Sequence, residues 1–231
     1  MKSDFSNNFE IKIVYDDICA QPGFLMGFGF SALIFNNLSK THLLFDTGGK
    51  GDILIHNINK FNVKVSEIKK VIISHNHYDH AGSLKEIYQI NHDIKIYVPL
   101  RDIKSFIKAY PEAQVQGISE MIEVDKNLFS SGQFGSRFLT EQSLFLKTEK
   151  KDLIIISGCA HPGLEAFILK GQTIANKIKA VIGGFHGFRD FSFLEGIEFV
   201  GACHCTQKIR EIKQRFSEQF KDICVGDSYL F

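Results

Sequence analysis

A chain of 231 residues in which 44% of the side chains are apolar is long enough to bury a full hydrophobic core. Its 27 basic and 26 acidic residues give a formal net charge of +1, which argues against nucleic acid or an anionic membrane as the main partner. The most apolar window, GFLMGFGFSALIF at 23–35, has thirteen residues and three glycines, and is too short to span a bilayer.

The N-terminal segment and the cysteines favour a cytoplasmic protein. The segment MKSDFSNNFE lacks the apolar core of a signal peptide. The five cysteines are odd in number and show no paired framework, which is typical of a reducing compartment.

Strand-like and helix-like runs are interspersed along the whole chain. Short apolar runs predict strands, and apolar side chains at helical spacing predict helices. The expected strands are 9–15, 30–35, 41–46, 69–74, 93–98, 143–147, 152–157, 178–184, 197–202 and 223–231. The expected helices are 51–61, 83–90, 101–110, 163–170 and 206–216, with Ser83 and Thr206 as candidate N-caps. Two packed sheets with helices outside would satisfy this order.

No linker divides the chain, so we expect a single domain over residues 1–231. The least regular segment is 111–142, which contains Gly117, Gly132 and Gly135. A long irregular segment in a compact domain is often a lid, and we expect this one to cover the functional site. The apolar window Phe24–Phe30 is a candidate for the wall of the cleft or for the subunit interface of a homo-oligomer.

The stretch SHNHYDHAGSL at 74–84 holds the strongest functional signal. It follows the buried strand 69–74 and precedes the helix expected from Ser83, so its polar side chains lie at the rim of a sheet. His75 and His77 are two residues apart and point to the same side of an extended backbone. Asp79 and His80 follow where the chain turns. Imidazole and carboxylate together suit zinc, iron or manganese, whereas the competing interpretation is a polar surface loop.

Three further histidines follow predicted strands directly. They are His161 in SGCAHPG, His186 in GGFHG and His204 in CHCT. Each one alone has a structural interpretation, as a satisfied core or turn histidine. Together, at the ends of strands like the first cluster, they indicate one composite metal site.

These motifs resemble the metallo-β-lactamase superfamily. HNHYDH at 75–80 matches its HxHxDH signature, and LLFDTGG at 43–49 resembles its upstream Asp-containing motif. SGCAHPG, GGFHG and CHCT are similar to a narrower group, the 7,8-dihydropterin-6-methyl-4-(ribofuranosyl)-aminobenzene 5′-phosphate synthases. The resemblance implies an α/β fold, an αββα sandwich of two mixed sheets with a one- or two-metal site at the edge between them. Cys159 stands where a metal-bridging aspartate is expected, as a thiolate ligand or as a small buried residue.

The resemblance implies a metal-dependent hydrolase or a related transferase or synthase. A divalent metal, zinc or else iron or manganese, would activate water for attack on a small anionic, phosphate-bearing and pterin-like substrate. We assign His75, His77 and His161 to one ion, and Asp79, His80 and His204 to the other. Asp79 would also orient the nucleophile, and His186 would contact substrate. The alternatives are a non-catalytic metal-binding sensor or interaction protein and a diiron oxidoreductase.

The CHCT motif allows a sulfur-rich site as an alternative to a histidine ligand. If residues 199–204 form one strand, His204 points to one face, whereas Cys203 and Cys205 point to the other. We therefore expect His204 to bind metal and both cysteines to pack as small buried or half-buried residues. The N-terminus of the following helix would offer N–H groups to an anionic substrate.

Overall fold

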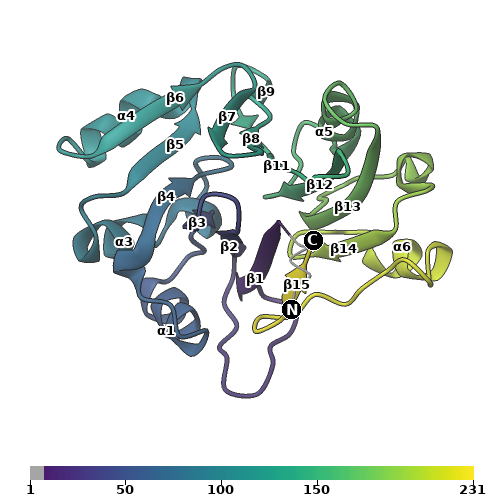
Figure 1. Ribbon diagram of the computed structural model, residues 1–231, viewed down its shortest axis with the longest axis horizontal. Helices are drawn as coiled ribbons and strands as arrows, with labels where there is room; N and C mark the ends of the chain where they lie inside the picture. Colours follow the sequence, from purple (N-terminus) through teal and green to yellow (C-terminus); the bar gives the residue numbers. More distant parts are fainter. Residues whose placement is uncertain (1–7) are drawn as a thin grey trace, which may run out of the picture.

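Two β-sheets lie face to face, and helices cover their outer faces (Figure 1). The computed structural model describes residues 8–231. The first sheet has seven strands in the order β15-β1-β2-β3-β4-β5-β6, and the second has six in the order β14-β13-β12-β11-β8-β7. Strands β3 to β6 and β12 to β14 run parallel and the other neighbours antiparallel, so both sheets are mixed. The expected αββα sandwich is confirmed.

Most strands follow the expected apolar runs, but the last one covers only Ser228–Leu230 of the expected 223–231, and β6, β7 and β8 lie outside the expected ranges. The first sheet contains β1 (Phe9–Tyr15), β2 (Ser31–Asn36), β3 (Thr41–Phe45), β4 (Ile68–Ile72), β5 (Lys95–Pro99), β6 (Gln114–Ile118) and β15 (Ser228–Leu230). The second contains β7 (Ile122–Asp125), β8 (Leu128–Ser130), β11 (Leu144–Lys147), β12 (Asp152–Ser157), β13 (Lys177–Gly184) and β14 (Phe199–Cys203). A hairpin of β9 (Phe134–Gly135) and β10 (Thr140–Glu141) joins β8 to β11.

The central strands are buried on both faces. In β12, Ile154 and Ile156 belong to the core between the sheets, whereas Leu153 and Ile155 belong to the layer beneath the helices. Successive side chains of a strand point to opposite faces, so a strand covered on both sides needs an unbroken apolar run. This requirement explains the run LIII at 153–156.

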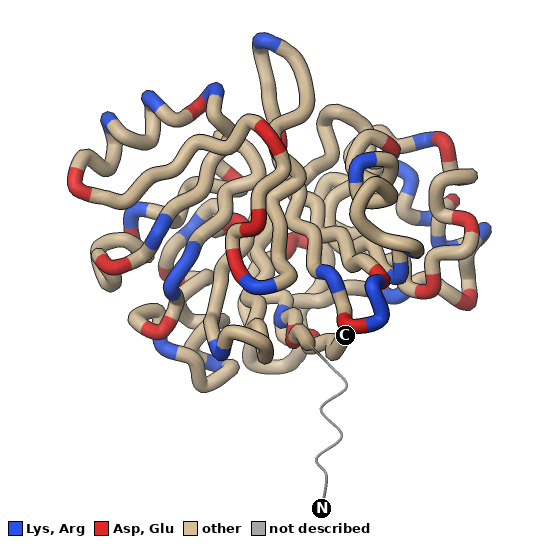
Figure 2. The backbone as a smooth tube through the Cα atoms, turned by 45° about the horizontal axis from the view of Figure 1, so that its top comes forward, with Lys and Arg blue, Asp and Glu red and all other residues tan. Residues whose placement is uncertain are grey.

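The helices are short and amphipathic. Helices α1 (Gly51–Lys60), α3 (Leu84–Ile90) and α4 (Ile103–Ala109) cover the first sheet, and α5 (Leu164–Gly171) and α6 (Ile209–Arg215) cover the second. The four-residue α2 (Tyr78–Ala81) lies inside the histidine motif. Within residues 8–231, no helix has the length and apolarity needed to cross a membrane. Basic and acidic residues are interspersed along the backbone (Figure 2), in keeping with a net charge of +1.

The segment 111–142 is more regular than we expected. It supplies β6 to the first sheet, β7 and β8 to the second, and the β9–β10 hairpin. Gly132, between β8 and β9, has a φ of +79°, and Gly135, at the end of β9, has a φ of +123°. The expectation of an irregular segment is therefore wrong, and the hairpin is the part that reaches the site described below.

Ser83 occupies the N-cap position of α3, but neither expected side-chain cap forms. The Ser83 hydroxyl donates to the carbonyl of Gly48 and does not cap α3. Helix α6 begins at Ile209 and not at 206, because the Thr206 hydroxyl accepts from the Phe185 N–H and donates to the Cys203 carbonyl. With seven residues, and starting five positions after His204, α6 is too short and too distant for the anion site that we expected.

The expectation that the cysteines form no pair is also wrong. Cys19 and Cys224 form a disulfide, although 205 positions separate them in the sequence. A β-bridge between Ala20 and Val225 lies beside it. The disulfide fastens the segment after β1 to the C-terminal segment, and a pairing over such a distance leaves no local signal in the sequence.

Candidate metal centre

The histidine motif and three strand ends meet at one edge of the sandwich. Strand β4 is followed by His75, β12 by Cys159, β13 by His186 and β14 by His204. All four strands are parallel members of their sheets, and the carboxyl ends of parallel strands share one edge. This common direction explains how residues far apart in the sequence come together.

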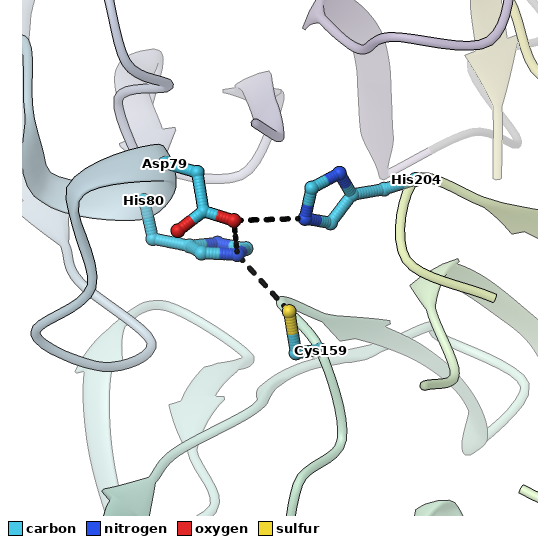
Figure 3. Close-up of side chains that lie close together, drawn as sticks. All are labelled: Asp79, His80, Cys159 and His204. Carbon is cyan, nitrogen blue, oxygen red and sulfur yellow. Dashed lines mark hydrogen bonds and ion pairs between the residues drawn. The ribbon is translucent and has the colours of Figure 1, made fainter. Parts of the chain in front are cut away.

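Two groups of candidate ligands form around the histidine motif, and a third set, Asp16, Asp17 and His204, shares His204 with one of them. One contains His75, His77 and His161, and the other contains Asp79, His80, Cys159 and His204. Within each group the ligand atoms all lie within 4.8 Å of one another. Figure 3 shows the four side chains of the second group pointing toward one another, Asp79 and His80 from α2 and the other two from loops of the second sheet. The structure thus brings together the six residues that the sequence assigned to metal, in the same two sets, and adds Cys159.

The histidines of the HxHxDH turn are oriented by a buried carboxylate. Asp46 follows β3 with a φ of +56° and is fully buried. It accepts from His80 Nδ1 at 2.7 Å and from the Ser74 hydroxyl at 2.6 Å. Because the Ser74 hydroxyl donates its only hydrogen to Asp46, it accepts from His75 Nδ1, 2.9 Å away. Both imidazoles therefore carry their hydrogen on Nδ1 and present the lone pair of Nε2 to the site.

The carboxylate of Glu141 orients the imidazole of His161 in the same way. This fully buried residue ends β10 and lies 2.9 Å from His161 Nδ1. It also accepts three backbone hydrogen bonds, from the N–H groups of Cys159, Ala160 and His161, at 2.8 to 2.9 Å. Burial alone would raise the pKa of Glu141, but the His161 hydrogen bond, the nearby His75 and these N–H groups lower it to about 2. Glu141 is therefore ionised.

His204 is held in the same way by Asp17. Asp17 Oδ1 lies 3.1 Å from His204 Nδ1, which directs Nε2 inward. His204 Nε2 is buried without a hydrogen-bond partner, 3.3 Å from Asp79 Oδ2. A lone pair facing a carboxylate is unfavourable unless a proton or a cation lies between them. Burial lowers the pKa of His204, but Asp17 and Asp79 raise it to about 10, which reflects how strongly this position favours positive charge.

The donor set fits a divalent metal ion. Burial and the adjacent His80 lower the pKa of His75 well below its usual range, so His75 is a neutral ligand. Three imidazoles in one group, and two imidazoles with a carboxylate and a sulfur in the other, are suitable ligand sets for zinc or iron. The outer carboxylates that fix the imidazole tautomers are the usual support of such ligands.

Cys159 lies within the second group. Its Sγ is 3.1 Å from His80 Nε2, and its side chain is buried. The hydrogen bond with Cys205 and burial raise the pKa of the Cys159 thiol. The sequence left two interpretations of Cys159 open, a buried cysteine and a sulfur ligand. The position of its side chain is compatible with both.

The CHCT motif differs from the expected strand. Strand β14 ends at Cys203, and His204 has a φ of +49°. The alternation of side chains between the two faces of the strand therefore ends one residue before the expected position, 204. Cys203 is buried in the core between the sheets, as expected. Cys205 is half-buried, also as expected, but the turn at His204 places its Sγ 3.8 Å from the Cys159 carbonyl. The expected alternation of side chains therefore fails at Cys205, which nevertheless belongs to neither ligand group.

His186 lies at the mouth of the site. Its exposed ring is 4.9 Å from the His161 ring, between centroids, and it belongs to neither ligand group. It lines two adjoining cavities of 460 and 580 Å³. Arg189, Glu165 and Asp190 are the charged residues of the smaller cavity, and Phe134 and Leu139 of the β9–β10 hairpin line the larger one.

Sequence reasoning missed the residues that hold the ligands. Asp46 lies in LLFDTGG and was noted only as part of a motif. Glu141 and Asp17 carried no recognisable signal, because each contacts a histidine through a loop. The window Phe24–Phe30 does reach the site: the Phe28 ring lies 5.8 Å from the His204 ring, between centroids.

Comparisons with known proteins agree with this geometry. A family model described as the metallo-beta-lactamase superfamily matches residues 26–135. The chain is 28% identical to 7,8-dihydropterin-6-methyl-4-(beta-D-ribofuranosyl)-aminobenzene-5′-phosphate synthase of Methanocaldococcus jannaschii, with 85% of each chain covered.

Solved structures share the fold at low identity. The metallo-beta-lactamase fold protein YhfI from Bacillus subtilis matches with a TM-score of 0.69 and 15% identity, over 96% of this chain and 99% of that one. The isothiocyanate hydrolase from Delia radicum gut bacteria matches with a TM-score of 0.64 and 12% identity, over 96% and 98%. The motif and the fold agree with the match of residues 26–135 to the metallo-beta-lactamase superfamily model.

Proposed function

We propose that this protein is a metal-dependent hydrolase, or a related transferase or synthase, acting on a small anionic substrate. The observation that carries the proposal is the common orientation of four imidazoles. Ser74, Asp46, Glu141 and Asp17 hold the Nδ1 atoms of His75, His80, His161 and His204, respectively. Lone pairs are thereby directed into two adjacent groups, an arrangement that is costly unless cations occupy it.

The candidate ligands would hold two metal ions, and zinc is the metal that we favour. His75, His77 and His161 would hold one, and Asp79, His80 and His204 the other, with Cys159 as a further ligand of the second. Bound divalent ions would lower the pKa of water toward ~7 and stabilise negative charge on a substrate oxygen. Burial of the half-buried Asp79 side chain would raise its pKa, but the adjacent imidazoles of His204 and His80 lower it to about 2. Asp79 is thus suited to bind a cation or to orient a water O–H, and not to store a proton.

We place the anionic end of the substrate in the polar cavity beyond His161, whose charged side chains are Arg189, Glu165 and Asp190. His186 and Arg189 line it together, and an imidazole and a guanidinium are common partners of phosphate. The relative from M. jannaschii is a synthase whose name contains a 5′-phosphate. We assign His186 to the substrate, as proton donor or phosphate contact. Each candidate ion already has three protein ligands without it, and a catalytic site needs only three ligands and a free position.

The test combines metal analysis with a substrate-class screen. Protein purified without added metal is analysed for its elements, loaded with zinc, iron or manganese, and offered phosphodiesters, phosphomonoesters, thioesters and lactones. We expect bound metal and turnover of at least one phosphate-bearing class, with at least 100-fold less turnover in Asp79→Ala at unchanged far-ultraviolet circular dichroism. Metal binding without turnover of any class would favour the non-catalytic alternative.

A further inference from the structure

Two cysteines from separate strands meet beside the second ligand group. Cys159 follows β12 and Cys205 follows β14, although β13 lies between these strands in the sheet. Their thiols are hydrogen-bonded to each other, and Cys205 Sγ lies 3.8 Å from the Cys159 carbonyl oxygen. The neighbouring Cys203 is buried in the core between the sheets. Cys159 and Cys205 are therefore the two thiols in contact, and we call them the thiol pair.

Gly184 allows the thiol pair to form. It is the last residue of β13, the strand that separates the two cysteines. A Cβ built on Gly184 would lie 2.7 Å from Cys205 Sγ and 3.3 Å from Cys159 Cα. Because glycine has no side chain, the Cys205 sulfur reaches across the end of β13 to Cys159. The two sulfurs are already neighbours, so no strand has to move to bring them together.

The two thiols differ in their access to solvent. Cys159 is buried, whereas Cys205 is half-buried and hydrogen-bonded to His186. His186 is exposed and lines the cavity of 460 Å³ at the mouth of the site. A small molecule that enters this cavity therefore reaches Cys205 before Cys159. An accessible cysteine with a second cysteine beside it is the usual arrangement of a thiol pair that responds to peroxide.

We propose that the thiol pair is an oxidative modification site, at which a hydroperoxide joins Cys159 and Cys205 in a disulfide. The Cys205 sulfur attacks one oxygen of hydrogen peroxide, the O–O bond breaks, and Cys205 becomes a sulfenic acid as hydroxide leaves. The Cys159 sulfur then attacks the Cys205 sulfur, the S–O bond breaks, and the oxygen leaves as water. The two thiols lose two electrons and two protons, and the peroxide becomes two molecules of water.

The disulfide would remove a sulfur ligand from the second ligand group. Cys159 Sγ lies 3.1 Å from His80 Nε2 and points into this group (Figure 3). A cysteine binds metal as a thiolate, and a disulfide has no thiolate to offer. Asp79, His80 and His204 would then remain as ligands of the second ion. This consequence rests on the proposed function, whereas the disulfide itself depends only on the thiol pair.

The first experiment detects the disulfide by peptide mapping. Reduced, metal-free protein is treated with one equivalent of hydrogen peroxide, blocked with iodoacetamide, digested with trypsin and analysed by mass spectrometry without reductant. We expect a linked pair of peptides, 152–170 with Cys159 and 190–208 with Cys205. Because Cys203 lies in the second peptide too, Cys205→Ser should abolish the linked pair, and Cys203→Ser is the matched control that should keep it.

The second experiment measures the effect of the disulfide on metal binding. Calorimetric zinc titration of the peroxide-treated protein should show the second ion bound about tenfold more weakly or worse, as in Cys159→Ser, because a ligand is lost. Dithiothreitol should restore the affinity of the untreated protein. Peroxide-treated Cys205→Ser should keep that affinity throughout.

Three outcomes would overturn the inference. They are the absence of the linked peptides after peroxide treatment, their persistence in Cys205→Ser, and zinc affinity that does not change when the disulfide forms. If the reduced protein binds no zinc, the proposed function fails, and the linked peptides alone decide on the thiol pair. Their presence in the unmodified protein and absence in Cys205→Ser would then support the modification site, and any other pattern would refute it.

Discussion

Removing the charge of Glu141 should destabilise the fold and weaken the first ligand group. Four hydrogen bonds end on this fully buried carboxylate, three from backbone N–H groups and one from His161 Nδ1. A pKa lowered from 4.5 to about 2 corresponds to roughly 3 kcal/mol of stability. Because the pKa is lowered in the folded state, this stability is complete above pH 4.5 and is lost as the pH falls toward 2. We therefore expect Glu141→Gln to cost about 2–3 kcal/mol in the free energy of unfolding at pH 7.

The assay is urea unfolding of metal-free protein with the disulfide intact, followed by zinc titration. Glu141→Gln should also bind the ion of the His75, His77 and His161 group about 10–100-fold more weakly, because His161 loses the carboxylate that fixes its tautomer. Glu149→Gln, on an exposed side chain, is the control and should change neither quantity. If Glu141→Gln leaves both stability and zinc affinity within error, the orientation argument fails for His161.

Three other variants test separate parts of the account. His186→Ala should retain full metal content and lose at least tenfold in turnover, and loss of a metal equivalent would make His186 a ligand. Cys159→Ser should weaken binding of the second ion and, in cobalt-loaded protein, remove a sulfur-to-metal charge-transfer band. The absence of such a band in the unmodified protein would leave Cys159 a buried residue only. Cys19→Ser should lower the free energy of unfolding by roughly 2–5 kcal/mol in neutral buffer without reductant. An unchanged unfolding midpoint would mean that the disulfide does not stabilise the fold.

The sandwich and the grouping of the candidate ligand residues could be predicted from the sequence, because both depend on local patterns. Doubly buried strands need unbroken apolar runs, and β12 has one at 153–156. The polar residues that follow β12, β13 and β14 share one edge, since these strands are parallel members of one sheet, and β4 brings its histidines to that edge from the other sheet. The spacing of His75 and His77 was sufficient to place both near one point.

The supporting residues could not be predicted, because they act across loops. Asp17 and His204 are 187 positions apart, and Cys19 and Cys224 are 205 apart. Local signals also failed where a tertiary contact competed with them. The Thr206 hydroxyl bonds the Phe185 N–H and so does not cap a helix.

The most direct test of the central claim is the metal stoichiometry of three proteins. Unmodified protein, His77→Ala and His204→Ala are loaded with zinc, dialysed and analysed by plasma mass spectrometry, with circular dichroism as the control for folding. The two ligand groups predict about two equivalents in the unmodified protein and about one in each variant, because each substitution removes a ligand from a different group. Unchanged stoichiometry in both folded variants, or no bound metal in the unmodified protein, would contradict the assignment of these histidines to metal.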